Sequence, residues 1–393
     1  MTNLATLKSV ILECLGRARL PSVGQGSRKN VEGLDSRLRG NDAIALFLLL
    51  FLISPSQAEF LVGPGATGSS FLKIPVSARA TGMAGSFTAV AGDVGAMEYN
   101  PAGLSEIYRT DINATLIRHI EESKIQAFSV AYPFAFKKNV GTGDGFFGPD
   151  SNKLFLGLHY RSFQADDLGR DIAGVPTGEF DIKDQLIQLG AAYTPFERLS
   201  LGLSGKIISS KLAGESLGNR ALDGGFLWKL SAITTVGASF LNFGPDKAFI
   251  SEADPLPTLL RAGLAIQTKR ILVAADLLTG RDKITKESLG VEISPNSILK
   301  IRGGILNATN LEFAGGVGLL FSPTMKTSSR PEKERKKNKR ILDDLDISSE
   351  NPVYKQYGAN DKFSKPLDFG VDYALRTHED LNVSHTITLK ILY

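Results

Sequence analysis

The sequence predicts an all-β fold, an antiparallel transmembrane β-barrel of about fourteen strands with an N-terminal hatch in its lumen. Three observations predict this fold class. Apolar and polar residues alternate over most of the chain after Tyr108, an apolar export signal precedes that region, and the last alternating segment ends on the aromatic residue Tyr393. A period of two residues is typical of strands with one apolar and one polar face.

The export signal is the first element along the chain. Residues 43–53 form a strongly apolar run that follows two arginines and ends at Ser56-Gln57-Ala58. A basic flank, a short apolar run and small residues at a cleavage site are the layout of a secretory signal peptide. A transmembrane helix needs about twenty apolar residues, so this run is too short to be one. We therefore expect residues 1–58 to be an upstream extension and signal peptide, cleaved near Ala58.

Composition narrows the classes of function. The 45 Lys and Arg residues nearly balance the 41 Asp and Glu residues, and the excess lies in one late segment. This argues against a nucleic-acid partner, which requires a basic face. The only cysteine, Cys14, precedes the expected cleavage site, so we expect neither disulfides nor thiol chemistry in the mature chain. The stretch LDSRLRGND in the extension resembles translated repeat sequence, which suggests a start codon downstream.

The alternating region divides into segments of about eight to eleven residues separated by turns. In the last one, Ile387 and Leu389 alternate with Thr386 and Thr388. Tight junctions and longer polar ones, such as 164–182 and 243–256, both occur, as in transmembrane barrels. The predicted strands are 110–120, 124–135, 153–163, 183–194, 198–210, 219–230, 232–242, 257–267, 270–279, 286–294, 298–307, 310–321, 366–376 and 382–393.

Alternation alone fits a soluble β-sandwich as well as a barrel, because both have one apolar and one polar face. The export signal, the strand length of about ten residues and the aromatic terminus favour the barrel. We assign residues 109–393 to it, with a charged loop insertion at 322–365. The polar face of the strands contains glycines that would let another segment approach closely: Gly190, Gly202, Gly225, Gly263 and Gly290.

Residues 59–108 lack alternating strands and are rich in small residues, as in SARATGMAGSFTAVAGDVGAMEYNPAGL. Small residues allow tight turns and close packing, so we expect this segment to form the hatch, a plug within the lumen. Its tetrapeptide Asn100-Pro101-Ala102-Gly103 is by itself an ordinary turn. Asn starts turns through its side chain, Pro fixes φ, and Gly tolerates a left-handed exit.

Taken whole, FLKIPVSARATGMAGSFTAVAGDVGAMEYNPAGL resembles the hatch of the FadL family of outer-membrane transporters for hydrophobic compounds, and more closely its PorV/PorQ branch. VGASFLNFGP, LGVEISPNSILKIRGGI and LDFGVDYAL extend the likeness over about residues 65–393, apart from the insertion. The resemblance implies a fourteen-stranded barrel with a hatch, solute passage in FadL members, and type IX secretion roles for PorV-like ones. Where relatives usually have an acidic pair, this chain has Gly92-Asp93-Val94-Gly95. The hatch motif carried onto this chain is Arg79, Gly82, Gly85, Asn100, Pro101 and Gly103.

Other motifs point to no chemistry. The fragment GPGATG at 63–68 has the spacing of a dinucleotide fingerprint, but Pro75 follows where a phosphate-binding helix should run. The four histidines lie at no metal-ligand spacing. A hydrolase built on Ser and His stays an alternative, although no nucleophile motif is visible. We expect no enzymatic activity and no catalytic residue, metal or cofactor. The basic run 330–340 fits a solvated loop better than a site for anionic lipid or a partner.

The sequence thus predicts an integral outer-membrane protein, surrounded by lipid, whose hatch gates the passage of hydrophobic small molecules bound in the lumen. The alternative is a PorV-like component of a secretion or surface-attachment system, with exported proteins or secretion machinery as partners. An open hydrophilic pore ranks third, because a hatch would occlude it. If both termini lie in the periplasm, the insertion, which follows the twelfth strand, lies there as well.

Overall fold

The computed structural model describes residues 67–119, 123–135, 153–170, 176–212, 214–248, 253–322, 367–378 and 383–393, all within one compact unit, Phe47–Tyr393. The upstream extension, the expected cleavage site near Ala58, and all but the first residue of the 322–365 insertion lie outside these residues. No helix among the described residues has the length and apolarity of a membrane span.

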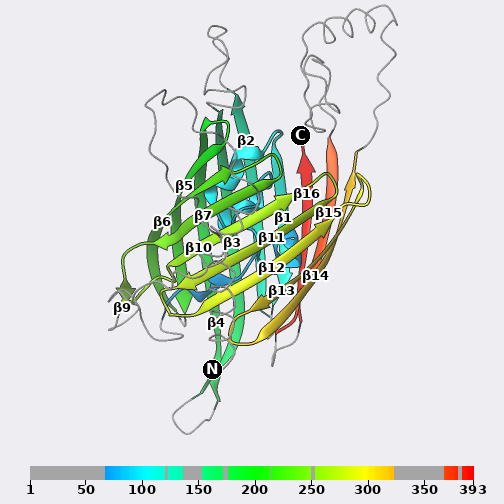
Figure 1. The fold of residues 1–393 in the computed structure, drawn as a ribbon. Coiled ribbons are helices and arrows are strands. Elements are labelled where there is room, and N and C mark those ends of the chain that lie inside the picture. The colour runs from blue at the N-terminus through cyan, green and yellow to red at the C-terminus, as the bar shows by residue number, and fades with distance from the viewer. Residues whose placement is uncertain are drawn as a thin grey trace, which may run out of the picture. The chain divides into compact units, whose positions relative to one another are not determined.

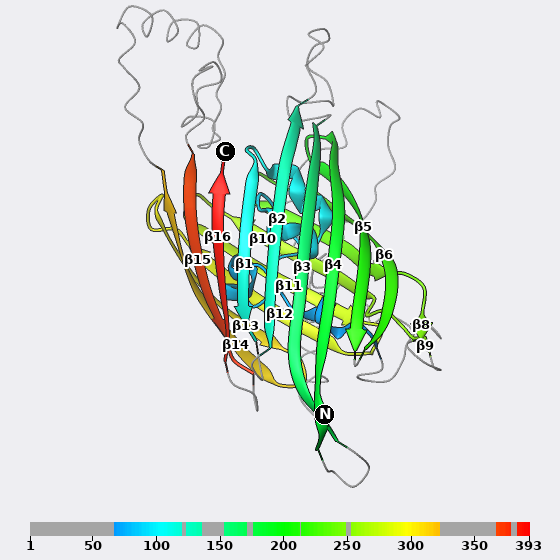
Figure 2. The same ribbon diagram turned by 180° about the vertical axis from the view of Figure 1, so that it is seen from behind.

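Fourteen antiparallel strands form a closed barrel, which confirms the predicted fold class and strand number (Figures 1 and 2). Each strand pairs with its neighbour along the chain, and β1 closes the barrel by pairing with β16. A separate two-stranded sheet, β8 (Lys247–Ala248) with β9 (Ala253–Asp254), lies between β7 and β10 in the chain. The barrel strands are β1 (Asp111–Arg118), β2 (Lys124–Ala135), β3 (Lys153–Arg170), β4 (Pro176–Phe196), β5 (Leu199–Leu212), β6 (Glu215–Lys229), β7 (Thr234–Phe243), β10 (Leu259–Gln267), β11 (Ile271–Gly280), β12 (Thr285–Ile293), β13 (Leu299–Asn307), β14 (Leu311–Phe321), β15 (Asp368–Arg376) and β16 (Ser384–Leu392).

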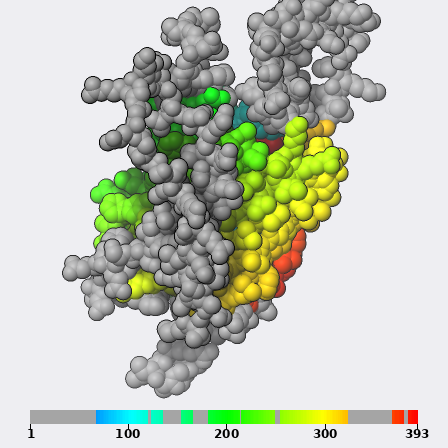
Figure 3. Space-filling view, in the orientation of Figure 1, coloured from blue at the N-terminus to red at the C-terminus, as the bar shows by residue number. Residues whose placement is uncertain are grey.

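Alternating side chains follow the pleat of the strands. In β16, Thr386 and Thr388 are buried toward the lumen, whereas Ile387 and Leu389 are exposed on the outside. Large apolar side chains cover the outer face of the barrel, and Leu203 is the most exposed of them at 71%. Figure 3 shows part of this outer face, on which the visible side chains of β10 to β14 form a continuous surface.

One predicted loop is wrong. Residues 164–182 were expected to be a polar loop, but β3 continues to Arg170 and β4 begins at Pro176. The two strands pair regularly as far as Gly169 with Gly178 and, after an irregularity, Arg170 with Pro176. The pairing between β2 and β3 ends earlier, at Gln164. Backbone hydrogen bonds within such a ribbon need no apolar face, so the hydrophobic pattern does not reveal it.

A lumenal segment, Thr67–Thr110, lies inside the barrel and consists of four short helices joined by turns (Figure 2). Side chains at three N-caps accept hydrogen bonds from the first turns: Ser77 from Ala80 N, Asp93 from Gly95 N and Asn100 from Ala102 N. Glycines with positive φ, Gly85 and Gly92, lie in the stretch between α3 and η2. The helices are η1 (Ser70–Lys73), α3 (Ala78–Gly82), η2 (Val94–Glu98) and η3 (Pro101–Glu106).

The lumenal segment packs directly on the barrel wall. Met83, Phe87 and Tyr99 form one apolar cluster with Ala265 and Ala274 of the wall. The five glycines predicted to admit a closely packed segment do so. A Cβ at any of these glycines would lie within 3.0 Å of an atom of the lumenal segment: Gly190, Gly202, Gly225, Gly263 and Gly290.

The lumenal segment runs from one rim of the barrel to the other. At its start, Gly68 N donates to Pro255 O, just before β10, and at its end Thr110 N donates to Tyr393 O. Since strands alternate in direction, the start of β1 and the start of β10, the eighth barrel strand, lie at opposite rims. We call these the Tyr393 rim and the Pro255 rim. Residues 1–66 lie outside the described residues, so the premise that both termini lie on one side stays a prediction. The strands β14 and β15 flank the insertion at the Tyr393 rim.

Candidate functional site

Two cavities of the lumen are lined by described residues, and the lumenal segment lies between them. The Tyr99 cavity, of about 130 Å³, reaches toward the Pro255 rim and is lined by residues of the lumenal segment and of the wall. The Lys300 cavity, of about 120 Å³, lies toward the Tyr393 rim against β13 to β16. Apolar side chains form much of the Tyr99 cavity wall, among them Leu72, Ile74, Leu186, Leu241, Leu259 and Leu306.

Six basic side chains also line the Tyr99 cavity, and five of them form ion pairs. Lys286, on the lumen-facing side of β12, forms none with any described residue. The five ion pairs are Lys73 with Asp282, Arg161 with Glu98, Lys206 with Asp223, Arg261 with Asp276, and Arg376 with Glu312.

Tyr99 contributes a second unmatched polar group. Its side chain is only 4% exposed, and its hydroxyl has no hydrogen-bond partner among the described residues. The Arg261 guanidinium lies 4.7 Å from the ring centroid and the Phe87 ring lies 5.5 Å away. Burial raises the pKa of Tyr99 to about 12, so the phenol remains an O–H donor at neutral pH.

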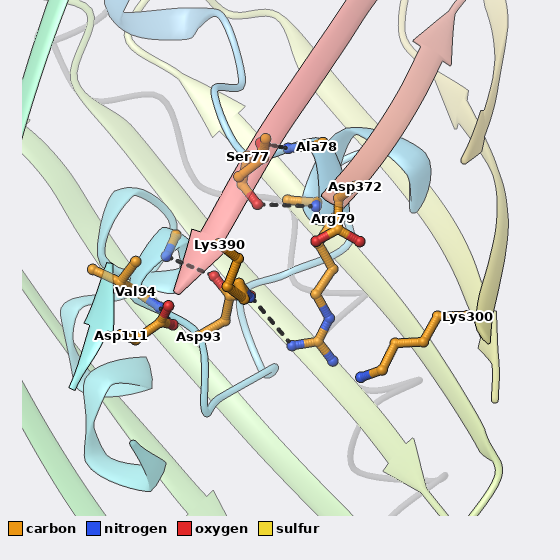
Figure 4. Close-up of polar contacts among 12 residues, drawn as sticks. Ser77, Ala78, Arg79, Asp93, Val94, Asp111, Lys300, Asp372 and Lys390 are labelled. Atoms are coloured by element: carbon orange, nitrogen blue, oxygen red, sulfur yellow. Dashed lines mark hydrogen bonds and ion pairs between the residues drawn. The ribbon is translucent and has the colours of Figure 1, made fainter. Parts of the chain in front are cut away.

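A cluster of buried charges fixes the lumenal segment beside the Lys300 cavity (Figure 4). Arg79 Nε and Nη2 each donate to a carboxylate oxygen of Glu292 at 3.0 Å. Lys390 Nζ donates to Asp93 Oδ2 at 2.5 Å, and a guanidinium nitrogen of Arg79 lies 3.7 Å from the same oxygen. Arg302 bridges Glu292 and Asp372 within the wall, at 2.7 and 2.5 Å. The lumenal segment is thus held by charge complementarity at this point.

Both charged groups that the lumenal segment brings to this cluster remain ionised. Burial raises the pKa of Asp93, but the charges of Lys390 and Arg79 outweigh it and hold that pKa well below its ordinary value. Burial lowers the pKa of Arg79, but Glu292 and Asp93 together raise it above its ordinary value. The contacts therefore persist across the physiological pH range.

Two further anchors lie on other sides of the barrel. Asp276 Oδ2 accepts hydrogen bonds from the backbone N–H groups of Phe87 and Thr88 at 3.0 and 2.9 Å. Glu98 forms an ion pair with Arg161 and lies 3.4 Å from His159 Nε2. Wall strands on several sides thus contribute polar partners to the segment.

The first half of the predicted hatch motif meets β12 to β14. Arg79 binds Glu292 of β12, as described above. A Cβ at Gly82 would lie 3.3 Å from both Arg302 Cβ and Gly316 Cα, so the glycine allows a close approach. Gly85 adopts φ 78°, a conformation that glycine favours, and its N–H donates to Ala80 O.

The second half of the motif meets β5 and β6. Asn100 Nδ2 donates to Thr88 O and Phe226 O, both at 2.9 Å, which joins η3 to another turn and to the wall. Pro101 begins η3, whose backbone packs on Gly202. The left-handed exit expected at Gly103 is wrong: the residue lies within η3, and a Cβ there would lie 2.6 Å from Ala96 Cβ. Position 103 therefore requires glycine because no larger side chain would fit there.

Four of the six motif residues form two separate contacts with the wall, Arg79 and Gly82 in one and Asn100 and Pro101 in the other. A Cβ at Gly85 or Gly103 would instead meet the lumenal segment itself. The structure also adds residues that sequence reasoning missed. Tyr99 adjoins the motif but was not singled out. The others are charged residues at lumen-facing positions of strands whose lumen faces are otherwise rich in Gly and Ser, and this contrast could have indicated them. They are Asp276, Lys286, Glu292, Arg302, Asp372 and Lys390.

The Ser/His alternative has a geometric counterpart within the wall. Ser129 Oγ and His159 Nδ1 lie 2.8 Å apart, next to Glu98. Ser129 and His159 are buried and line neither the Tyr99 cavity nor the Lys300 cavity. Across the described ranges, no group of three His, Cys, Asp or Glu side chains could hold a metal ion.

No protein-family model matches the sequence, and no curated protein matches it. Similar solved structures include the CymD monoaromatic hydrocarbon channel, with 14% identity, a TM-score of 0.48, and 81% of this chain and 96% of that chain covered. A Pseudomonas aeruginosa FadL homologue has 10% identity and a TM-score of 0.47, with 81% and 98% covered. The Pseudomonas putida toluene transporter TodX has 14% identity and a TM-score of 0.44, with 86% and 99% covered. At these values the likeness assigns neither a family nor a function.

Proposed function

We propose that this protein is an integral outer-membrane barrel that passes hydrophobic small molecules through its lumen, with the lumenal segment as the hatch. The observation that carries the proposal is the pair of cavities on either side of the lumenal segment, of which the Tyr99 cavity has apolar side chains over much of its wall. A solute that crosses the barrel has a place to bind on one side of the hatch and a space to enter on the other.

The outer surface supports a membrane location. Many large apolar side chains are exposed on the outer face, and Leu189 and Leu203 are 63% and 71% exposed. An exposed apolar surface of this size would be unfavourable in water but not in lipid. Closure through β1 and β16 leaves no open sheet edge, as lipid requires. Exposed aromatic side chains near the Tyr393 rim, including Trp228, Phe321 and Tyr393, fit a girdle at a membrane interface.

The part of the wall formed by β12 to β14 borders both cavities. Ser288 and Leu306 line the Tyr99 cavity, while Lys300 and Arg302 line the Lys300 cavity. Between these positions, α3 and the turn after it pack on glycines of the wall, Gly290, Gly304 and Gly316. Movement of this turn away from the glycines would join the two cavities.

A disulfide between the hatch and the wall tests the gate. Ser86 Oγ of the turn after α3 lies 2.9 Å from Ser288 Oγ of β12, so cysteines at both positions suit a cross-link. We expect the oxidised Ser86→Cys, Ser288→Cys protein to insert normally but to lose uptake of a hydrophobic probe, and a membrane-permeable reductant to restore it. The Ser86→Cys single variant is the matched control.

Uptake that is equal in the oxidised and reduced protein would contradict a gate at this place. If solute permeability is unaffected by every hatch variant while surface display of exported proteins fails, the secretion alternative takes the place of transport.

A further inference from the structure

We infer that the Tyr99 cavity binds a small organic monoanion of single-ring size, with the Lys286 ammonium and the Tyr99 hydroxyl as its head-group site. The inference rests on the proposed function, because it names the class of solute that the lumen accepts. It depends on three features of the cavity: unmatched donors, charge and volume.

The first feature is the hydrogen bonding of the lining. Lys286 Nζ and Tyr99 OH have no acceptor among the described residues, although both side chains line the cavity. Acceptors in the lining already have donors: Asp282 binds Lys73, and Asn242 Oδ1 binds Lys206. Buried polar groups are normally paired, whereas these two donors of the cavity are not. A ligand that fits must therefore supply acceptor atoms.

The second feature is the charge. The other five basic residues of the lining have carboxylate partners, so their charges are balanced by ion pairs. Lys286 leaves one positive charge without an ion-pair partner among the described residues, and an unpaired charge inside a barrel is costly. A single negative charge on the ligand would neutralise it, whereas an uncharged hydrocarbon would leave it unpaired.

The third feature is the volume. In another protein, an apolar cavity of about 150 Å³ holds one benzene molecule. The Tyr99 cavity, at about 130 Å³, has room for one ring or a chain of similar size. A long alkyl chain would extend beyond it. Charge and volume together point to a compact organic acid such as benzoate.

Binding to the full-length protein in detergent, measured by isothermal titration calorimetry, tests the inference. The probes are benzoate, its uncharged isostere benzamide, and the long-chain acid dodecanoate. We expect the wild-type protein to bind benzoate at least about ten-fold more tightly than benzamide, the difference that one charged hydrogen bond provides. Equal binding of the two, or tighter binding of dodecanoate, would overturn the inference.

Variants locate the site. Lys286→Met should weaken benzoate binding about ten-fold or more and leave benzamide binding unchanged. Tyr99→Phe, which removes only the hydroxyl, should weaken benzoate binding about three- to ten-fold. Lys269→Met, in an exposed turn away from the cavity, is the matched control and should bind benzoate like the wild-type protein. Unchanged benzoate binding in Lys286→Met would show that the head group lies elsewhere. The comparison of probes on the wild-type protein does not depend on the folding of any variant.

Uptake by cells separates this inference from the proposed function. If benzoate binds as expected but neither it nor a hydrophobic probe enters cells faster through the barrel, the inference stands and the transport function fails. If uptake of uncharged hydrophobic probes depends on the barrel while benzoate does not bind, the transport function stands and the inference fails.

Discussion

Gly103 shows how one residue limits the packing of the lumenal segment. The residue needs no unusual backbone conformation, since it lies within η3. A Cβ in its place would lie 2.6 Å from Ala96 Cβ and 3.1 Å from Val90 O, both within the same segment. Space, not φ, therefore explains the glycine of the Asn-Pro-Ala-Gly turn.

We expect Gly103→Val to destabilise the packing of η2 against η3 by about 1–3 kcal/mol, as overpacking does, and to leave the barrel intact. The variant should raise the permeability of cells to small antibiotics, while its insertion stays normal. Gly303→Val is a matched control, because a Cβ at Gly303 meets no atom within 4 Å. Equal permeability of the two variants would show that η3 does not contribute to closure.

At the scale of elements, η2 depends on Asp93 in two ways. Its carboxylate accepts a hydrogen bond from Gly95 N at 2.8 Å and forms the ion pair with Lys390 of β16. Asparagine would keep the cap and lose the charge. The substitution Asp93→Asn would therefore remove the ion pair that fixes η2 to the wall and keep the hydrogen bond that caps the helix.

The depressed pKa of Asp93 predicts how this contact depends on pH. A group whose pKa is lower in the folded state adds stability above its ordinary pKa of about 3.9, and this stability is lost only as pH falls through the lower value. The ion pair with Lys390 should thus be formed at both pH 7 and pH 5, and Asp93→Asn should reduce the hydrogen-exchange protection factors of η2 at both values. Protection of η2 that is the same in Asp93→Asn and in the wild-type protein at both values would contradict the assignment.

The strands could be predicted from the sequence because each has one face in the lumen and one outside, which produces a period of two residues. The ribbon beyond Gln164 could not, since its polar residues keep no such period. The glycines of the lumen face, such as Gly202 and Gly290, indicated a packed segment. The partners of that segment were not predictable, because alternation places Glu292 and Lys390 on the lumen face without showing which residues they meet.

At the scale of the whole barrel, closure by hydrogen bonds between neighbouring strands predicts resistance to detergent. The protein should fractionate with the outer membrane and migrate differently on gels before and after heating, because the closed ladder resists unfolding by detergent. Recovery from the soluble periplasmic fraction would contradict the membrane location. Gly303→Val should behave like the wild-type protein in this assay.

The path of the lumenal segment also constrains the order of assembly. The segment reaches from Pro255 at one rim to Tyr393 at the other and continues directly into β1, at the seam with β16. Glycines that touch the segment lie on many strands of the wall, so a finished barrel has little room through which the segment could be threaded. We therefore expect the segment to be in place before β1 pairs with β16.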